Sequence, residues 1–186
     1  MTHNEMKKKV LALIEEVNPD SENLTDDPDI QAKYIYVANQ ILYELARNKK
    51  IPKYVEMEVS EGDTVDFSFI SMFCGSEVYQ ISLTSGVRHT AKANGTVFKI
   101  LEDGTLEVEC FVYPKRITEE NADKYVFDIS PDALEVMPYG VAADLLKSDV
   151  SAEYGAVYAT RYETMLQRLD PRYAMTSVSI EGGVKI

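Results

Sequence analysis

The spacing of apolar residues changes twice along this chain. Before about residue 50 and again after about residue 130, apolar residues recur every three or four positions, as on one face of a helix. Between about residues 52 and 114 they alternate with polar residues, which is typical of strands. The pattern predicts an α+β fold in which two helix pairs form a helical layer and an antiparallel β-rich insertion lies between them.

Two helices are predicted in the first 50 residues. The first covers residues 6–17 and has Met6, Val10, Leu13, Ile14 and Val17 on one face. The second covers residues 29–47, and the basic residues that follow suit the negative end of a helix dipole. An acidic loop joins the two, so the chain opens with a helix pair.

Six strands are predicted in the middle of the chain, at residues 54–59, 65–70, 78–83, 86–91, 96–100 and 105–113. Asn94-Gly95 and Asp103-Gly104 are typical of two-residue hairpin turns, which join antiparallel neighbours. We therefore expect a meander or a small barrel. One helical turn at residues 118–121 and a short strand at residues 125–127 are predicted to follow.

The longest consistent helical pattern covers residues 130–169. Ser130 is expected to cap its first helix, and Pro138 is expected to kink or restart that helix. A break at Ser148-Asp149 then separates a second helix at residues 150–169. The apolar stripe of this second helix is Tyr154, Val157, Tyr158, Met165, Leu166 and Leu169. The short connector predicts antiparallel neighbours.

These patterns divide the chain into four segments. Residues 1–50 form one helix pair, residues 51–129 the β-rich insertion, residues 130–170 the second helix pair, and residues 171–186 a flexible tail. The tail alternates polar and apolar residues, so it is suited to adding a strand to the sheet edge of a partner. The predicted docking residues are Ser177, Val178, Ser179 and Ile180. A chain end without a binding role is the alternative.

Composition narrows the class of protein. A chain of 186 residues with 45% hydrophobic content can form a sizeable core, as one domain or as a core with an elaborated insertion. Its 31 acidic and 19 basic residues give a net charge of −12, which argues against sequence-independent binding to nucleic acid. No apolar run approaches the roughly 20 residues that cross a bilayer, so we expect a cytosolic protein without a membrane partner.

Candidate chemistry is sparse. His3 is expected at a frayed terminus and His89 on a surface strand, and neither has the neighbours of a zinc site or a catalytic pair. The acidic segment Asp26-Asp27-Pro28-Asp29 lacks the glycine and the distal glutamate of a calcium loop. Cys74 and Cys110 are expected as free, buried thiols. We predict no cofactor, no metal site and no catalytic residue, and therefore not an enzyme.

Tyrosine is the unusual feature of the composition, with 12 tyrosines and no tryptophan. Tyrosine suits half-buried surfaces that have an apolar side and a wet side, including subunit interfaces. Tyr154, Tyr158, Arg161 and Tyr162 are the predicted interface residues, on a helix that suits packing better than catalysis. An ordinary rim around the core is the alternative.

The run from Leu134 to Leu146, with Tyr154, Tyr158, residues 161–163 and residues 165–166, resembles a known helix pair. It is similar to the carboxy-terminal helices of tailed-bacteriophage head-tail connector proteins, the adaptor or neck subunits. The opening helix pair and the β-rich insertion resemble this family in architecture only.

The resemblance implies a structural protein of a virion or prophage. Such a subunit forms a homo-oligomeric ring beneath the portal protein, contacts tail or stopper proteins, and lets DNA pass without binding it specifically. Its location is the virion, and the cytoplasm of the bacterial host during assembly. The alternative in the same class is a tail-completion or tail-terminator subunit. The alternative in another class is a small acidic enzyme whose site combines carboxylates and tyrosines.

Overall fold

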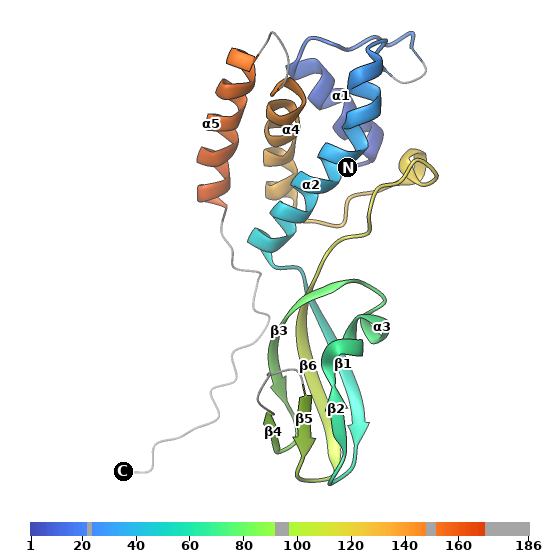
Figure 1. Cartoon of the computed structure of the whole chain (residues 1–186), viewed down its shortest axis with the longest axis vertical. Helices are drawn as coiled ribbons and strands as arrows, with labels where there is room; N and C mark the ends of the chain where they lie inside the picture. Colours follow the sequence, from blue (N-terminus) through green and yellow to red (C-terminus); the bar gives the residue numbers. More distant parts are fainter. Residues whose placement is uncertain (22–23, 92–96, 148–151, 170–186) are drawn as a thin grey trace.

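The longer helices and the strands occupy opposite ends of an elongated molecule in the computed structural model, which describes residues 1–21, 24–91, 97–147 and 152–169 (Figure 1). The predicted mixture of helices and antiparallel sheets is confirmed. Within the described residues the α-helices are α1 (His3–Leu13), α2 (Pro28–Lys49), α3 (Ile70–Cys74), α4 (Pro131–Leu146) and α5 (Ala152–Arg168). The strands are β1 (Pro52–Val59), β2 (Thr64–Asp66), β3 (Val78–Ser85), β4 (His89–Ala91), β5 (Val97–Ile100) and β6 (Gly104–Val112). The short helix α3 lies beside the strands.

Helix α4 is the centre of the helical end. It packs against α1, α2 and α5, and its apolar residues are buried on all sides, as expected for a helix that neighbours surround. A methyl group at Gly140 would lie only 2.8 Å from the ring of Tyr162, so this glycine lets α5 approach closely. Pro138 lies inside a continuous helix, so the helix is not restarted there, which corrects that part of the prediction.

Local signals set the helix starts. Thr2 and Glu5 form a reciprocal capping box, so α1 begins three residues before the predicted start. Asp27 caps α2 by accepting hydrogen bonds from the backbone N–H groups of residues 29 and 30. Ser130 stands at the start of α4, but its side chain makes no capping hydrogen bond, which corrects that prediction. None of the described helices is both long and apolar enough to cross a membrane.

The β end corrects the predicted strand order. Within the described residues the strands form two antiparallel sheets, ordered β1-β6-β3 and β2-β5-β4, in place of a meander or barrel. The β4–β5 pair agrees with a hairpin at Asn94-Gly95, although those two residues lie outside the described ones. The β5–β6 pair predicted from Asp103-Gly104 is wrong, because the Asp103 carboxylate accepts a hydrogen bond from the Glu61 backbone 2.7 Å away and the chain crosses between sheets.

Two further strand predictions are corrected. The strand expected at residues 65–70 ends at Asp66, whose carboxylate accepts a hydrogen bond from the Ser68 N–H and starts a 3-10 helix, η1 (Phe67–Phe69). Residues 125–127 make only an isolated bridge, between Val126 and Thr2. The helical turn predicted at residues 118–121 precedes a 3-10 helix, η2 (Ala122–Lys124).

Each end of the molecule has its own hydrophobic core, and a group of aromatic and basic side chains joins the two ends. We call Tyr43, Arg47, Tyr79 and Tyr113 the aromatic joint. The ring of Tyr113 stacks on Tyr43 and lies against Tyr79, with centroids 4.7 Å apart in both pairs. The Tyr113 hydroxyl accepts a hydrogen bond from Arg47 at 2.5 Å, and the Tyr79 hydroxyl donates to the Ala46 carbonyl at 3.1 Å. The joint thus fixes the strands to the end of α2.

Candidate functional site

The predicted interface residues lie on α5, and the structure separates them into two groups. Tyr154 is 69% exposed and Val157 is 64% exposed, so both point away from the protein. This corrects the predicted stripe, which placed them on the packed side. The packed side begins at Gly155, where an added methyl group would lie 3.2 Å from Leu146.

Tyr158 and Tyr162 face the protein's own core. The Tyr162 side chain is only 7% exposed, and its hydroxyl donates a hydrogen bond to Glu44 of α2 at 2.9 Å. Burial, and then the charge of Glu44, raises the pKa of Tyr162 far above its usual value, so the phenol keeps its proton. The Tyr158 hydroxyl donates to the carbonyl of Leu13 at the end of α1. These two tyrosines hold α5 against α1 and α2.

The outer face of α5 remains as a candidate contact surface. Tyr154, Val157, Arg161, Thr164 and Arg168 follow one another at steps of three and four residues, the spacing of a helix–helix seam. The Arg161 guanidinium lies 4.4 Å from the centre of the Tyr139 ring, a cation–π contact that holds it beside the seam. The residues that line a shallow groove of about 610 Å³ on this helix are Val157, Thr160, Arg161, Thr164, Met165 and Arg168. We call this surface the outer α5 face.

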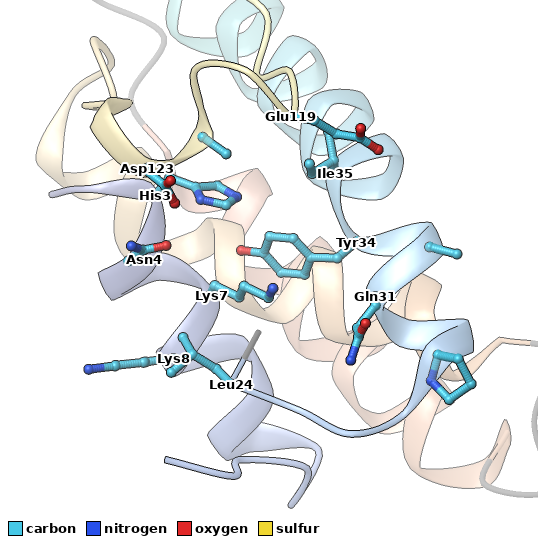
Figure 2. Close-up of a pocket in the computed structure, with 13 residues that line it drawn as sticks. His3, Asn4, Lys7, Lys8, Leu24, Gln31, Tyr34, Ile35, Glu119 and Asp123 are labelled. Carbon is cyan, nitrogen blue, oxygen red and sulfur yellow. The ribbon is translucent and has the colours of Figure 1, made fainter. Parts of the chain in front are cut away.

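A second candidate site was not predicted from the sequence. A cavity of about 770 Å³ lies between α1, α2 and the segment around η2 (Figure 2). We call it the His3–Tyr34 pocket. Its polar lining consists of His3, Asn4, Lys7, Lys8, Gln31, Tyr34, Glu119 and Asp123.

Two polar side chains inside this pocket have no hydrogen-bond partner in the protein. His3 is 3% exposed and Tyr34 is 1% exposed, and neither ring nitrogen of His3 nor the Tyr34 hydroxyl is bonded. The two rings meet edge to face with centroids 5.5 Å apart. Figure 2 shows the Tyr34 hydroxyl pointing into the space bordered by His3, Asn4 and Lys7. Buried polar groups are nearly always bonded, so this arrangement requires an explanation.

Burial and neighbouring charges keep the His3 and Tyr34 side chains uncharged near neutral pH. Burial, followed by the charge of Lys7, lowers the pKa of His3, while Asn4 and Asp123 act in the opposite direction. Burial raises the pKa of Tyr34 far above its usual value and lowers the pKa of Lys7. The pocket therefore holds a neutral imidazole and a neutral phenol, with the Lys7 ammonium 5.5 Å from the centre of the Tyr34 ring.

His3 corrects the expectation of a frayed terminus. Its backbone N–H donates to the Tyr125 carbonyl at 2.9 Å, and the Phe127 N–H donates to the Met1 carbonyl at 3.1 Å. These bonds join residues more than a hundred positions apart, so periodicity gave no sign of them. The Thr2–Glu5 capping box was the one local signal that could have placed His3 in a helix.

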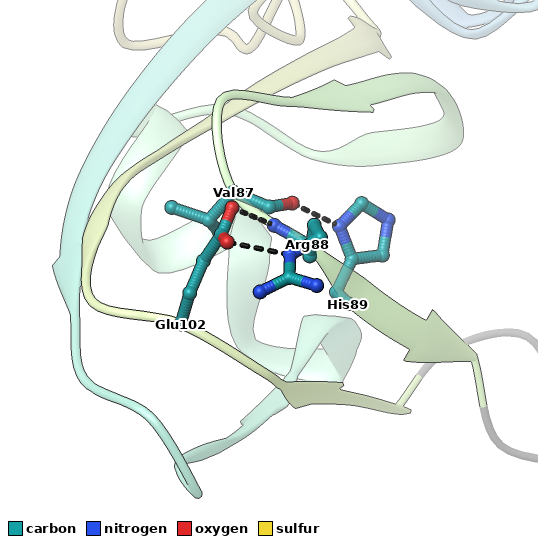
Figure 3. Close-up of polar contacts among 4 residues, drawn as sticks. All are labelled: Val87, Arg88, His89 and Glu102. Carbon is teal, nitrogen blue, oxygen red and sulfur yellow. Dashed lines mark hydrogen bonds and ion pairs between the residues drawn. The ribbon is translucent and has the colours of Figure 1, made fainter.

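His89 lies at the β end and has both ring nitrogens occupied. Nδ1 donates to the Val87 carbonyl at 2.8 Å, so Nε2 accepts from the Thr84 hydroxyl at 3.0 Å. Beside it, Arg88 binds the Glu102 carboxylate through its backbone N–H at 2.8 Å and its side-chain Nε at 2.6 Å (Figure 3). Those hydrogen bonds lower the pKa of Glu102. These contacts connect the chain from the end of β3 to the start of β4 with the link between β5 and β6.

The prediction that Cys74 and Cys110 are free, buried thiols is confirmed. Their proximity was not predicted, since the two sulfur atoms lie 3.2 Å apart. Burial, followed by the Cys74 thiol, raises the pKa of Cys110 to about 12, so Cys110 is a poor nucleophile near neutral pH. Among the described residues, no three His, Cys, Asp or Glu side chains form a group that could hold a metal ion.

The predicted docking residues Ser177, Val178, Ser179 and Ile180 lie outside the described residues. Comparison with known proteins finds no family model and no curated protein that matches this chain. The outer α5 face and the His3–Tyr34 pocket are therefore the features on which a functional proposal rests.

Proposed function

We propose that this protein is a head-tail connector subunit of a tailed bacteriophage or prophage, forming a ring beneath the portal through which DNA passes. The observation that carries the proposal is the outer α5 face. It exposes Tyr154 and Val157 on one of the two helices that resemble the connector family. In this proposal two helix pairs form one layer, and the β-rich insertion projects from it.

Surface chemistry supports assembly through the outer α5 face. Large exposed apolar residues that follow one another along a helix are typical of contact surfaces. Arg161 and Arg168 add positive charge to this face, while the whole chain carries a net charge of −12. The acidic surface of a neighbouring copy is thus electrostatically complementary to the outer α5 face.

The same charge suits the passage of DNA. Acidic residues on the inner wall of a ring repel the phosphate backbone, so packaged DNA does not adhere to the channel. Residues 177–186 form the docking tail in this proposal and add a strand to a sheet edge of the portal. The protein is then found in the virion, and in the host cytoplasm during assembly.

Electron microscopy of the purified protein, with and without the portal protein of the same phage, tests this function. The proposal predicts rings or portal-bound collars. Val157→Asp should abolish them without unfolding the protein, because this side chain is exposed. Tyr36→Ser is the matched control, since Tyr36 is 67% exposed on α2, away from the outer α5 face. Rings that bind a tail tube and not the portal would favour a tail-completion or tail-terminator subunit.

The His3–Tyr34 pocket favours a second candidate function, a small acidic enzyme. It brings the carboxylates of Glu119 and Asp123 to the same cavity as the Tyr34 phenol. A protein that remains monomeric in the presence of portal, and that loses a measured activity in Tyr34→Phe, would support this function over the connector.

A further inference from the structure

The His3–Tyr34 pocket has a chemical character that the connector function does not require. We propose that it binds a small zwitterionic amino acid, which carries an ammonium group, a carboxylate and an apolar side chain. The inference is independent of ring assembly, because none of the pocket residues lies on the outer α5 face.

The unpartnered groups define what a ligand must offer. A neutral imidazole has one N–H donor and one nitrogen that accepts, and a phenol donates one hydrogen bond. His3 and Tyr34 are both more than nine-tenths buried, so each unmade hydrogen bond is a cost to the folded protein. A ligand with both acceptors and donors would satisfy the two side chains together, whereas a purely anionic or purely cationic one would leave an atom unpaired.

Charged side chains of both signs line the pocket. Lys7 and Lys8 lie on α1, while Glu119 and Asp123 come from the segment around η2 (Figure 2). The lysines suit an oxyanion, which also accepts the hydrogen bond of the Tyr34 hydroxyl. The carboxylates suit an ammonium group, which also donates to the unprotonated nitrogen of His3. Charges of both signs in one cavity therefore favour a dipolar ligand.

Size and apolar lining agree with a small amino compound. A volume of about 770 Å³ lies within the range of about 300–1,000 Å³ that is typical of sites for small molecules. Leu24, Ala32 and Ile35 contribute apolar surface to the same cavity. A branched aliphatic side chain beside the two charged groups would contact this apolar surface.

Three related probes test the proposal by calorimetric titration of the full-length protein. L-Leucine carries both charged groups, 4-methylpentanoate carries only the carboxylate, and 3-methylbutylamine carries only the ammonium group. We expect leucine to bind at least about tenfold more tightly than either of the other two, because each of them lacks one charge-assisted hydrogen-bonding group. Equal binding of all three probes, or no binding of any of them, would overturn the proposal, since the two charged groups of leucine would then have no role in the pocket.

Variants separate the two ends of the site. Tyr34→Phe should weaken leucine binding by about tenfold or more and leave the melting temperature unchanged or higher, because it removes a buried hydroxyl that has no partner. Lys7→Met should remove the preference for leucine over the amine, and Asp123→Asn the preference for leucine over the carboxylate. Tyr36→Phe, at an exposed position of α2, is the control and should bind as the natural protein does. Undiminished binding in Tyr34→Phe would show that leucine binds elsewhere.

Discussion

The helical end and the β end of this molecule build their cores from different parts of the chain. The helical core combines α1 and α2 with α4 and α5, so its residues come from both halves of the sequence. The buried residues of the β core all lie between residues 59 and 112. The partly buried apolar residues that pack against them lie between residues 51 and 98. One end is thus assembled from distant segments, whereas the other comes from one continuous stretch. A substitution in the helical core is therefore expected to weaken contacts between the two halves of the sequence.

The largest expected effect is therefore in the helical core. Leu145→Ala should lower the free energy of unfolding by roughly 2–5 kcal/mol, because it leaves a cavity on the buried side of α4. Leu166→Ala should cost less, since Leu166 is only partly buried at the edge of that core. Urea unfolding followed by circular dichroism measures both, and Val157→Ala serves as an exposed control. A loss below about 1 kcal/mol for Leu145→Ala would contradict this placement of the core.

Asn39 tests how the helical end holds the chain that returns from the β end. Its buried amide donates to the Ile117 carbonyl and accepts from the Ile117 N–H, at 2.8 Å in both cases. Asn39→Leu should cost about 1–3 kcal/mol, because both backbone groups lose their partner in a buried place. Asn48→Leu is the matched control on the same helix, where the side chain is exposed. Equal effects in the two variants would contradict a special role for Asn39.

A smaller effect is expected at the aromatic joint. Tyr79→Phe keeps the ring against Tyr113 but removes the hydrogen bond to the Ala46 carbonyl, so it should cost about 1 kcal/mol. Hydrogen exchange should then increase at the end of α2 and in β3 and leave α4 unchanged. An increase spread evenly over both ends would argue against a local connection between them.

The smallest effect expected is a pH dependence confined to the helical end. Because the pKa of His3 is lowered in the folded protein from 6.5, the unfolded chain takes up its proton first as the pH falls. Stability due to this group is complete above about pH 6.5 and decreases as the pH falls toward the lowered value. Urea midpoints at pH 7.5 and 5.5 should differ less in His3→Gln than in the natural protein. The same difference in both proteins would contradict a neutral, buried His3.

Local and distant interactions explain which features could be predicted from the sequence. Helix positions follow from spacing and caps within a few residues, and α2 and α4 were predicted to within two residues at each end. Strand pairing depends on distant partners, so the Asp103-Gly104 turn was misinterpreted: the Asp103 carboxylate binds the loop after β1. A helical pattern also fits two neighbouring stripes, which is why Tyr154 and Val157 were assigned to the packed side of α5.

The pocket could not be predicted for the same reason. His3 and Tyr34 are separated by thirty residues on two helices, and the wall that encloses them comes from residues 119–123. No local motif connects these three segments. Of the predicted interface tyrosines, Tyr154 is exposed, whereas Tyr162 is bonded to Glu44 within the same chain.

Mass photometry of the protein mixed with portal tests the proposed function most directly. Each bound subunit adds 21.0 kDa, so a ring should raise the mass of the portal by one fixed multiple of this value. Val157→Asp should remove the increase, and Tyr36→Ser should leave it unchanged. A portal whose mass does not change, beside a protein that stays at 21.0 kDa at every concentration, would contradict the assignment as a connector subunit.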